Sequence, residues 1–185
     1  SKNAFQAEID SACETIDFFR FNNYYAGNLY AGQPSSTPDQ LNRAEYRPLE
    51  GFVMAVTPFN FTSIASNLNM TPVLMGNTTI WKPSTTALLS NYHMMQIFME
   101  AGLPAGVVNF LPGKGSLIGN VALNNPNLAG IHFTGSTGTF QGLWKGVGAN
   151  ISNYKSYPRL VGETGGKDFI FAHSSAHARE VATAI

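Results

Sequence analysis

A carboxylate and a carboxamide stand where the chain could bring them to a bound molecule. Glu163 lies in VGETGGK (residues 161–167), among glycines that permit the close approach of another group. It could act as a general base, although most glutamates are solvated surface groups. Asn60 lies in TPFNFT (residues 57–62), at the expected start of a helix with unpaired backbone donors. Its amide could stabilise an oxyanion, or it could merely cap that helix.

Other segments carry groups suited to a ribose or a phosphate. Lys82, in WKPS (residues 81–84), follows an expected strand, where it could bind either group or simply be solvated. Backbone donors and hydroxyls at the start of a later helix could cradle a phosphate while also capping the helix; these residues are Gly135, Ser136, Thr137, Gly138 and Thr139. The run PGKGSLIG (residues 112–119) resembles a dinucleotide fingerprint, but its last glycine comes one residue too late. It indicates either a turn that lets a helix pack closely or an approach point for a cofactor.

The remaining reactive side chains form no recognisable centre. Cys13 is the single cysteine, and its spacing from Phe5, Ile9 and Ile16 places it on the apolar stripe of an amphipathic helix. We therefore expect a buried, unreactive thiol. The four histidines form no helical pair backed by a carboxylate, so we expect no metal site. No elbow motif supports a Ser-His-Asp triad.

The composition is that of a globular protein. Eleven basic and eleven acidic residues give no net charge, which argues against nucleic acid or an anionic membrane as a partner. With 44% hydrophobic residues, the 185-residue chain can bury one good core. No run reaches the length of a transmembrane span, and nothing at the start resembles a targeting peptide.

Short apolar runs alternate with helical patterns from residue 52 onward. We predict strands at 52–56, 78–81, 107–111, 128–133 and 159–161, with 169–171 as a candidate sixth. Helices are predicted at 62–75, 84–101, 116–123 and 137–151. This alternation predicts an α/β fold with a doubly wound, mostly parallel, Rossmann-like sheet. Ligands of such sheets bind at the carboxyl ends of the strands, which is where the polar residues described above lie.

The chain divides into two parts by composition. We expect residues 1–45 to form a helix and a connecting arm, because Gly, Pro, Ser, Thr and Asn are dense from residue 32 onward. Residues 46–185 are expected to form the main domain, which contains the predicted sheet. The helical run from residue 176 to residue 185 has neither a cap nor a breaker, so we expect a piece of a longer protein, incomplete at both ends.

Five segments together resemble the aldehyde dehydrogenase superfamily in both order and spacing. They are PFNF (58–61), WKPS (81–84), GLP with NFLPG (102–104 and 109–113), FTGST (133–137) and ETGGK (163–167). The flanking segments YRPLEGF (46–52) and YPRLVGE (157–163) are most similar to the delta-1-pyrroline-5-carboxylate dehydrogenases of that superfamily, in their eukaryotic mitochondrial form. The resemblance spans essentially the whole chain.

The resemblance implies NAD as cofactor, with residues 46–185 as an NAD-binding domain truncated before the catalytic domain. It also assigns roles to single residues. Asn60 would be the oxyanion donor, Glu163 the general base and Lys82 a contact to the adenosine ribose. Thr57 would adjoin NAD, Phe61 would border the aldehyde pocket, and the pyrophosphate contacts would come from Gly135, Ser136, Thr137, Gly138 and Thr139. Thr85 stands where many relatives have an acidic residue that binds the ribose hydroxyls, so NAD rather than NADP is implied by the family alone.

The implied parent enzyme oxidises glutamate semialdehyde to glutamate in proline degradation. The family's catalytic cysteine would follow the helix that begins near residue 176, so the 185 residues themselves are expected to be inactive. The resemblance further implies a small aldehyde substrate, a homo-oligomeric parent (dimer or larger) and a mitochondrial matrix location. Two alternatives stay open: a dehydrogenase for another semialdehyde, and a noncatalytic nucleotide-binding module.

Overall fold

Five parallel strands form the centre of the molecule in the computed structural model, which describes residues 2–166 and 169–184. The strands are β1 (Phe52–Val56), β2 (Thr78–Lys82), β3 (Val108–Phe110), β4 (Leu128–Gly135) and β5 (Arg159–Thr164). Their order across the sheet is β3-β2-β1-β4-β5, and every neighbouring pair is parallel. The predicted α/β class and parallel sheet are therefore confirmed.

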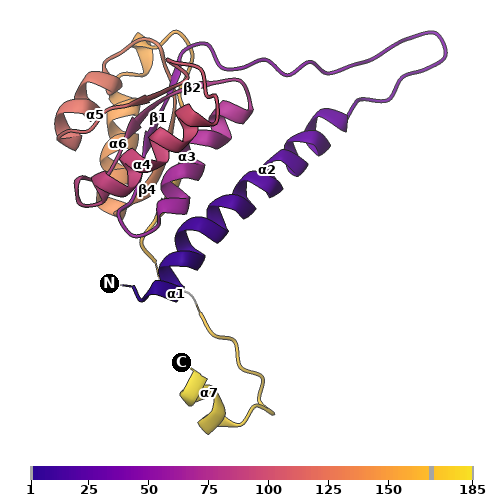
Figure 1. Ribbon diagram of the computed structural model, residues 1–185. Coiled ribbons are helices and arrows are strands. Elements are labelled where there is room, and N and C mark those ends of the chain that lie inside the picture. The colour runs from indigo at the N-terminus through magenta and orange to yellow at the C-terminus, as the bar shows by residue number, and fades with distance from the viewer. Residues whose placement is uncertain (1, 167–168, 185) are drawn as a thin grey trace.

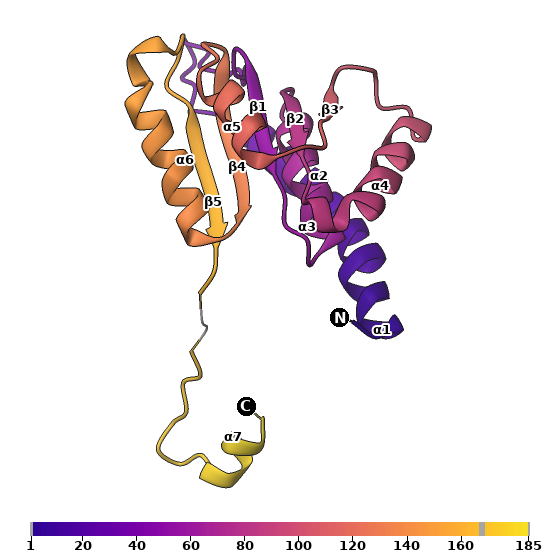
Figure 2. The same ribbon diagram turned by 90° about the vertical axis from the view of Figure 1, so that its left-hand side faces the viewer.

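Helices cover both faces of this sheet (Figure 2). On one face lie α3 (Thr62–Leu74) and α4 (Leu88–Glu100), and on the other lie α5 (Gly115–Leu123) and α6 (Thr137–Ala149). A 3₁₀ turn, Thr85–Ala87, replaces the predicted first turn of α4, and a second one, Ile151–Asn153, follows α6.

Each face of the sheet has its own hydrophobic core. Beneath α5 and α6, the buried residues are Met54, Ala122, Leu128, Ile131, Phe133 and Val147. Beneath α3 and α4, they are Ala65, Trp81, Phe98 and Val108. Strands buried on both faces read as continuous apolar runs, which is why the sequence FVMAV predicts β1 with the right bounds.

Gly51 lets β1 begin beside β4. Its φ of 125° lies in the region that favours glycine, and an added Cβ would fall 2.0 Å from the carbonyl oxygen of Asn127. Phe52 N–H donates to that same carbonyl at 3.0 Å. The pairing then skips from Leu128 to Gly130, a local bulge, before it runs in register to Val56 and Phe133.

The N-terminal segment forms one long helical rod followed by an arm (Figure 1). It comprises α1 (Ala4–Ala7), a π-helical segment (Glu8–Cys13) and α2 (Glu14–Ala31). The rod packs on α3, and Phe19 joins the core beneath that helix. Between α2 and β1 the chain has only one isolated bridge, Thr37 with Gln40, and no helix or strand.

The predicted burial of Cys13 is wrong. Its side chain is exposed, and Phe5 and Ile9 on the same stripe are 82% and 57% exposed. The buried positions of α2 are Thr15 and Ala26 instead. The π-helical segment has a wider turn than the regular helix that the spacing assumed, so the face that meets α3 differs from the apolar stripe.

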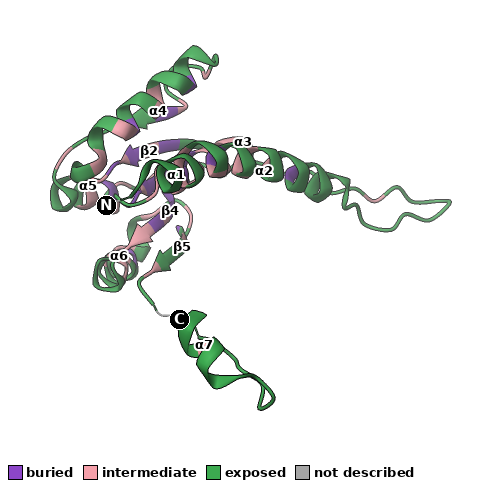
Figure 3. Cartoon of the chain, turned by 60° about the horizontal axis from the view of Figure 1, so that its bottom comes forward, coloured by how far each residue is buried: buried purple, intermediate pink, exposed green. Residues whose placement is uncertain are grey.

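The last part of the chain lies away from the sheet (Figures 1 and 3). The candidate sixth strand at residues 169–171 is wrong, since these residues form no strand and Phe169 and Phe171 are largely exposed. The helical run predicted from residue 176 appears as α7 (Ala178–Ala184). Within the described residues, no helix combines the length and the apolarity needed to cross a bilayer.

Candidate active site

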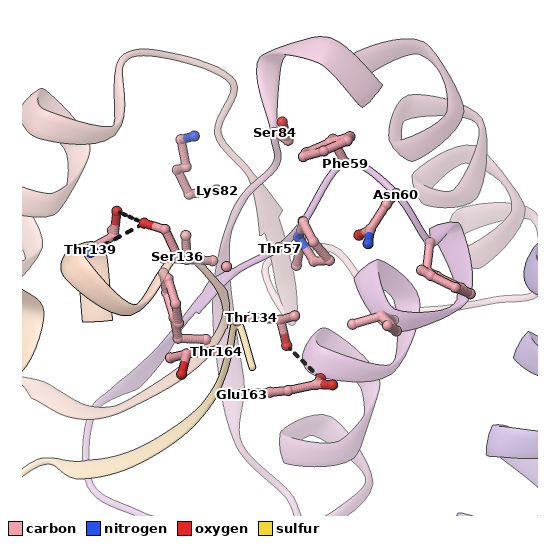
Figure 4. A pocket seen from close by; sticks show the side chains of 17 residues that line it. Thr57, Phe59, Asn60, Lys82, Ser84, Thr134, Ser136, Thr139, Glu163 and Thr164 are labelled. Atoms are coloured by element: carbon pink, nitrogen blue, oxygen red, sulfur yellow. Dashed lines mark hydrogen bonds between the residues drawn. The ribbon is translucent and has the colours of Figure 1, made fainter. Parts of the chain in front are cut away.

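A pocket of about 520 Å³ opens at the carboxyl ends of β1, β2, β4 and β5 (Figure 4). The chain winds from β1 outward to β2 and β3, then returns to the other side of β1 to form β4 and β5. Such a reversal leaves a crevice between the loops that leave β1 and β4, and parallel sheets bind their ligands there. Eight of the ten predicted site residues line the pocket: Thr57, Asn60, Phe61, Lys82, Gly135, Ser136, Thr139 and Glu163.

Glu163 enters the pocket from the end of the edge strand β5. It pairs in register with Thr134 of β4, and the Thr134 hydroxyl donates to Glu163 Oε2 at 3.2 Å. Gly162, the residue before it, packs directly under the Phe140 ring of α6. The glutamate is exposed, so a bound water or substrate can reach its carboxylate.

Asn60 lies across the pocket from Glu163, in the loop between β1 and α3 (Figure 4). Its side chain does not cap α3, because the N-cap residue of that helix is Phe61 and no side chain bonds the first turn. The capping alternative is therefore wrong, and the amide is left exposed to the pocket. An exposed carboxamide beside a helix start can donate to a developing oxyanion.

Phe61 connects the pocket to the N-terminal rod. The Lys2 ammonium lies 3.5 Å from the centre of its ring, a cation–π distance. Lys2 is also paired with Asp10 at 2.7 Å. In addition, Ser63 of α3 donates to the carboxylate of Glu14. The rod therefore holds the start of α3 beside the end of the pocket that contains Asn60.

Thr57 has a structural hydrogen bond as well as a position in the pocket wall. The side chain is almost fully buried, and its hydroxyl oxygen accepts the indole N–H of Trp81 at 2.9 Å. Trp81 itself is completely buried under α3 and α4. The contact fixes the end of β1 against the neighbouring strand β2.

Lys82 reaches the pocket from the end of β2. It is half-buried, and this burial lowers the pKa of its ammonium group. A Cβ added at Gly115 would lie 3.7 Å from Lys82 Cε, so the ammonium lies beside the first residue of α5. The side chain is therefore not simply solvated, and the glycine-rich run at residues 112–119 adjoins it.

The start of α6 supplies hydroxyls and backbone donors. Ser136 caps the helix by accepting from Thr139 N–H at 3.3 Å, and the two hydroxyl oxygens lie 2.7 Å apart. Both residues line the pocket, as does Gly135. Thr137 and Gly138 do not line it: Thr137 donates its hydroxyl to the Gly165 carbonyl at 3.4 Å, and Gly138 faces open space.

Among the nine lining residues that were not predicted as site residues are Phe59, Ser84 and Thr164. All three follow or end a strand, so their position alone is a signal. Their types are common at such places, which is why residue type could not single them out. Lys167, the last residue of the segment that contains Glu163, lies outside the described residues.

The pocket is lined by two chemically different sets of groups. Lys82, Ser136 and Thr139 offer an ammonium group and hydroxyls, which suit anionic and hydroxylated groups. Asn60 and Glu163 offer an amide donor and a carboxylate, which suit an oxyanion and a proton. Among residues 2–166 and 169–184, no cluster of His, Cys, Asp and Glu could hold a metal ion.

Comparison with known proteins agrees with this geometry. A probable delta-1-pyrroline-5-carboxylate dehydrogenase of Schizosaccharomyces pombe is 56% identical over 181 residues, covering 96% of this chain and 33% of that protein. The human mitochondrial delta-1-pyrroline-5-carboxylate dehydrogenase is 51% identical over 97% of this chain and 32% of its own length. The chain thus spans about a third of the curated relatives it matches.

A solved structure has the same fold over the full chain. The Mycobacterium tuberculosis delta-pyrroline-5-carboxylate dehydrogenase bound with NAD aligns with a TM-score of 0.94 and 59% identity, covering 100% of this chain and 34% of that one. The model of the aldehyde dehydrogenase family matches residues 1–185. With a parallel sheet, a strand-end pocket and a family match along its whole length, the chain belongs to the aldehyde dehydrogenase family.

Proposed function

We propose that this chain is the NAD-binding part of a delta-1-pyrroline-5-carboxylate dehydrogenase that oxidises glutamate semialdehyde to glutamate in proline degradation. The observation that carries the proposal is the pocket itself, which brings Lys82, Asn60 and Glu163 together in one lining. The 59% identity to the NAD-bound mycobacterial enzyme supports both the cofactor and the substrate.

The donor set fits a dinucleotide. Lys82 and the hydroxyls of Ser136 and Thr139 would hold the phosphates and the adenosine ribose, together with the first backbone donors of α6. Gly115 leaves room beside Lys82 for a ribose or a phosphate. NAD, when bound, supplies the hydride acceptor.

In the proposed reaction, the residues of this chain stabilise charge and move protons. Asn60 donates its amide hydrogen to the oxygen of the aldehyde as negative charge develops there. Glu163 accepts a proton from the water that releases the acid product. Cys13 does not line the pocket, so the nucleophilic thiolate is assigned to the part of the parent protein that this chain does not cover.

The test is an assay of the full-length parent with pyrroline-5-carboxylate and NAD, followed by NADH absorbance. Glu163→Gln and Asn60→Ala are each expected to lower kcat by about 10²–10³-fold. Glu100→Gln, the same exchange at an exposed position at the end of α4, is the matched control and is expected to keep wild-type turnover. A folded parent that makes no NADH, or a Glu163→Gln variant with full activity, would overturn the proposal.

Two further tests separate the binding and substrate claims. The 185-residue chain alone is expected to give no turnover, and calorimetric titration with NAD measures how much of the cofactor site it contains. Competition between pyrroline-5-carboxylate and other semialdehydes on the parent tests the substrate. Preference for a different semialdehyde would keep the family mechanism and replace the substrate.

The proposal extends to assembly and location of the parent. We expect a homo-oligomer, dimer or larger, which light scattering on the purified parent would measure. Several relatives carry "mitochondrial" in their names, including those of Dictyostelium discoideum and Homo sapiens. A mitochondrial matrix location for the parent rests on those names, and fractionation of cells that express it would test it.

A further inference from the structure

Among the described residues, one hydrogen bond fixes the direction of the Glu163 side chain. Thr134 and Glu163 are register partners on the parallel strands β4 and β5, so both side chains leave the same face of the sheet. The hydroxyl of Thr134 donates to Oε2 at 3.2 Å, because an ionised carboxylate can only accept (Figure 4). The other oxygen, Oε1, keeps its lone pairs for a water or a substrate.

The neighbours of Glu163 on its own strand do not restrain its side chain. Along a strand, the neighbours on the same face are two residues away, and here they are Val161 and Gly165. Val161 is 57% exposed, and Gly165 has no side chain and no heavy atom within 4 Å of a built Cβ. A glutamate loses substantial rotamer freedom when it is held in one position, so an unrestrained carboxylate would sample many directions.

Because of the position of β5, the direction of the Glu163 side chain decides whether its carboxylate lies over the pocket. β5 is an edge strand, and β4 lies between it and β1. The bond to Thr134 holds the carboxylate toward β4, the strand that lies between β5 and β1, whose following loop carries Asn60. Without that bond, the same side chain could extend past the edge into solvent.

We propose that Thr134 is a positioning residue for the general base: its hydroxyl holds the Glu163 carboxylate over the pocket, in the orientation that accepts a proton. This inference rests on the proposed function, since it assigns Thr134 to the same reaction. Thr134 itself touches neither the aldehyde nor the attacking water in this scheme. Its whole effect on turnover passes through Glu163.

The test uses the full-length parent and compares Thr134→Val with Thr134→Ser. Valine has the shape and strand preference of threonine but lacks the hydroxyl, whereas serine keeps it. We expect Thr134→Val to lower kcat about tenfold, the size of one lost hydrogen bond to a charged group. The KM for NAD should stay unchanged, and Thr134→Ser should restore most of kcat. Thermal unfolding and NAD titration show that each variant is folded.

A double-mutant cycle separates positioning from a general structural effect. In the Glu163→Gln background, Thr134→Val should cause no further loss of residual turnover. An equal loss in both backgrounds, or no loss in either, overturns the role of Thr134 while leaving the proposed function standing. A wild-type parent without turnover, or full activity of Glu163→Gln, overturns the proposed function and the role of Thr134 together.

Discussion

The indole N–H of Trp81 donates to the hydroxyl oxygen of Thr57 inside the core. The bond is 2.9 Å long, and Trp81 is completely buried. Replacing Thr57 with valine removes the acceptor and leaves the indole N–H unpaired in a dry environment. We expect Thr57→Val to lower the free energy of unfolding by about 1–3 kcal/mol, measured by urea denaturation.

Thr79 on β2 provides a matched control for this substitution. It is also completely buried, but its hydroxyl has no hydrogen-bond partner among the described residues. Thr79→Val therefore removes an unsatisfied polar group, and we expect a neutral or stabilising effect. Equal destabilisation by the two valine substitutions would contradict the assigned role of the Thr57 hydroxyl.

His132 makes stability depend on pH. Its Nδ1–H donates to the Leu68 carbonyl at 3.1 Å, which joins β4 to α3. Burial lowers the pKa of the ring below its ordinary 6.5, and the backbone hydrogen bond only partly opposes this. The unfolded chain therefore binds a proton at a higher pH than the folded one, so stability present above 6.5 is lost as the pH falls.

We expect the free energy of unfolding to begin to fall below about pH 7.5 and to keep falling as the pH passes below 6.5, the ordinary pKa of the ring. His132→Gln, which keeps a donor but cannot take up a proton, should flatten this dependence. Urea denaturation at several pH values measures both slopes. An unchanged slope in the variant would assign the pH dependence to other groups.

For single residues, the ends of the predicted strands were the feature of the sequence that indicated the site. Asn60, Lys82 and Glu163 could be predicted because polar groups after parallel strands converge at one edge of the sheet. Thr137 and Gly138 were predicted with their neighbours, but a helix turns its residues in different directions, so only part of the segment faces the pocket. Cys13 was placed wrongly because periodicity identifies a stripe but not what covers it.

Among the elements, α6 and β5 approach each other closely at Gly162. A Cβ added there would lie 2.4 Å from two ring atoms of Phe140, and that ring is stacked against Phe133. Gly162→Ala must therefore displace the ring or move β5. We expect a loss of about 1–3 kcal/mol in the free energy of unfolding, together with lower turnover of the parent because Glu163, the proposed general base, is the next residue.

Gly142, within α6, is the matched control for Gly162. A Cβ added at Gly142 meets nothing within 4 Å, and alanine is favoured over glycine inside a helix by about 1 kcal/mol. Gly142→Ala should therefore stabilise the protein. If both substitutions stabilise it, the contact between Phe140 and Gly162 is not a constraint.

The elements themselves differ in how well sequence predicts them. The bounds of β1 and the presence of α3 to α6 could be predicted, because buried strands and amphipathic helices have distinct periods. Phe169, Ile170 and Phe171 have strand-forming side chains, yet no strand forms, since pairing needs a neighbouring edge that local sequence does not reveal. The π-helical segment Glu8–Cys13 has no sequence signal that we recognise.

For the molecule as a whole, the buried residues are concentrated in the sheet and in the helices that pack on it (Figure 3). The arm before β1 contains Arg43, which is paired with Glu45 at 2.9 Å but keeps 67% of its side chain exposed. We expect brief trypsin treatment to cut first after Arg43. Lys145 is also exposed, but it lies within α6, where cleavage requires the helix to open locally. Mass spectrometry of the early products measures the order, and a first cut at Lys145 would contradict this assignment of local stability.

The pairing of β1 with β4 joins Phe52 to Leu128, although β2 and β3 intervene in the chain. The pocket has its wall on both sides of that seam, so it has no precursor in any shorter stretch of sequence. During synthesis, β1, β2 and β3 can leave the ribosome and pair while half of the pocket is still untranslated. Pairing β4 with β1 closes the long loop of chain between them, and the entropy lost in closing such a loop slows this step. The proposed dinucleotide site is therefore among the last features to form, and a nucleotide that binds it can stabilise only chains whose sheet is already assembled.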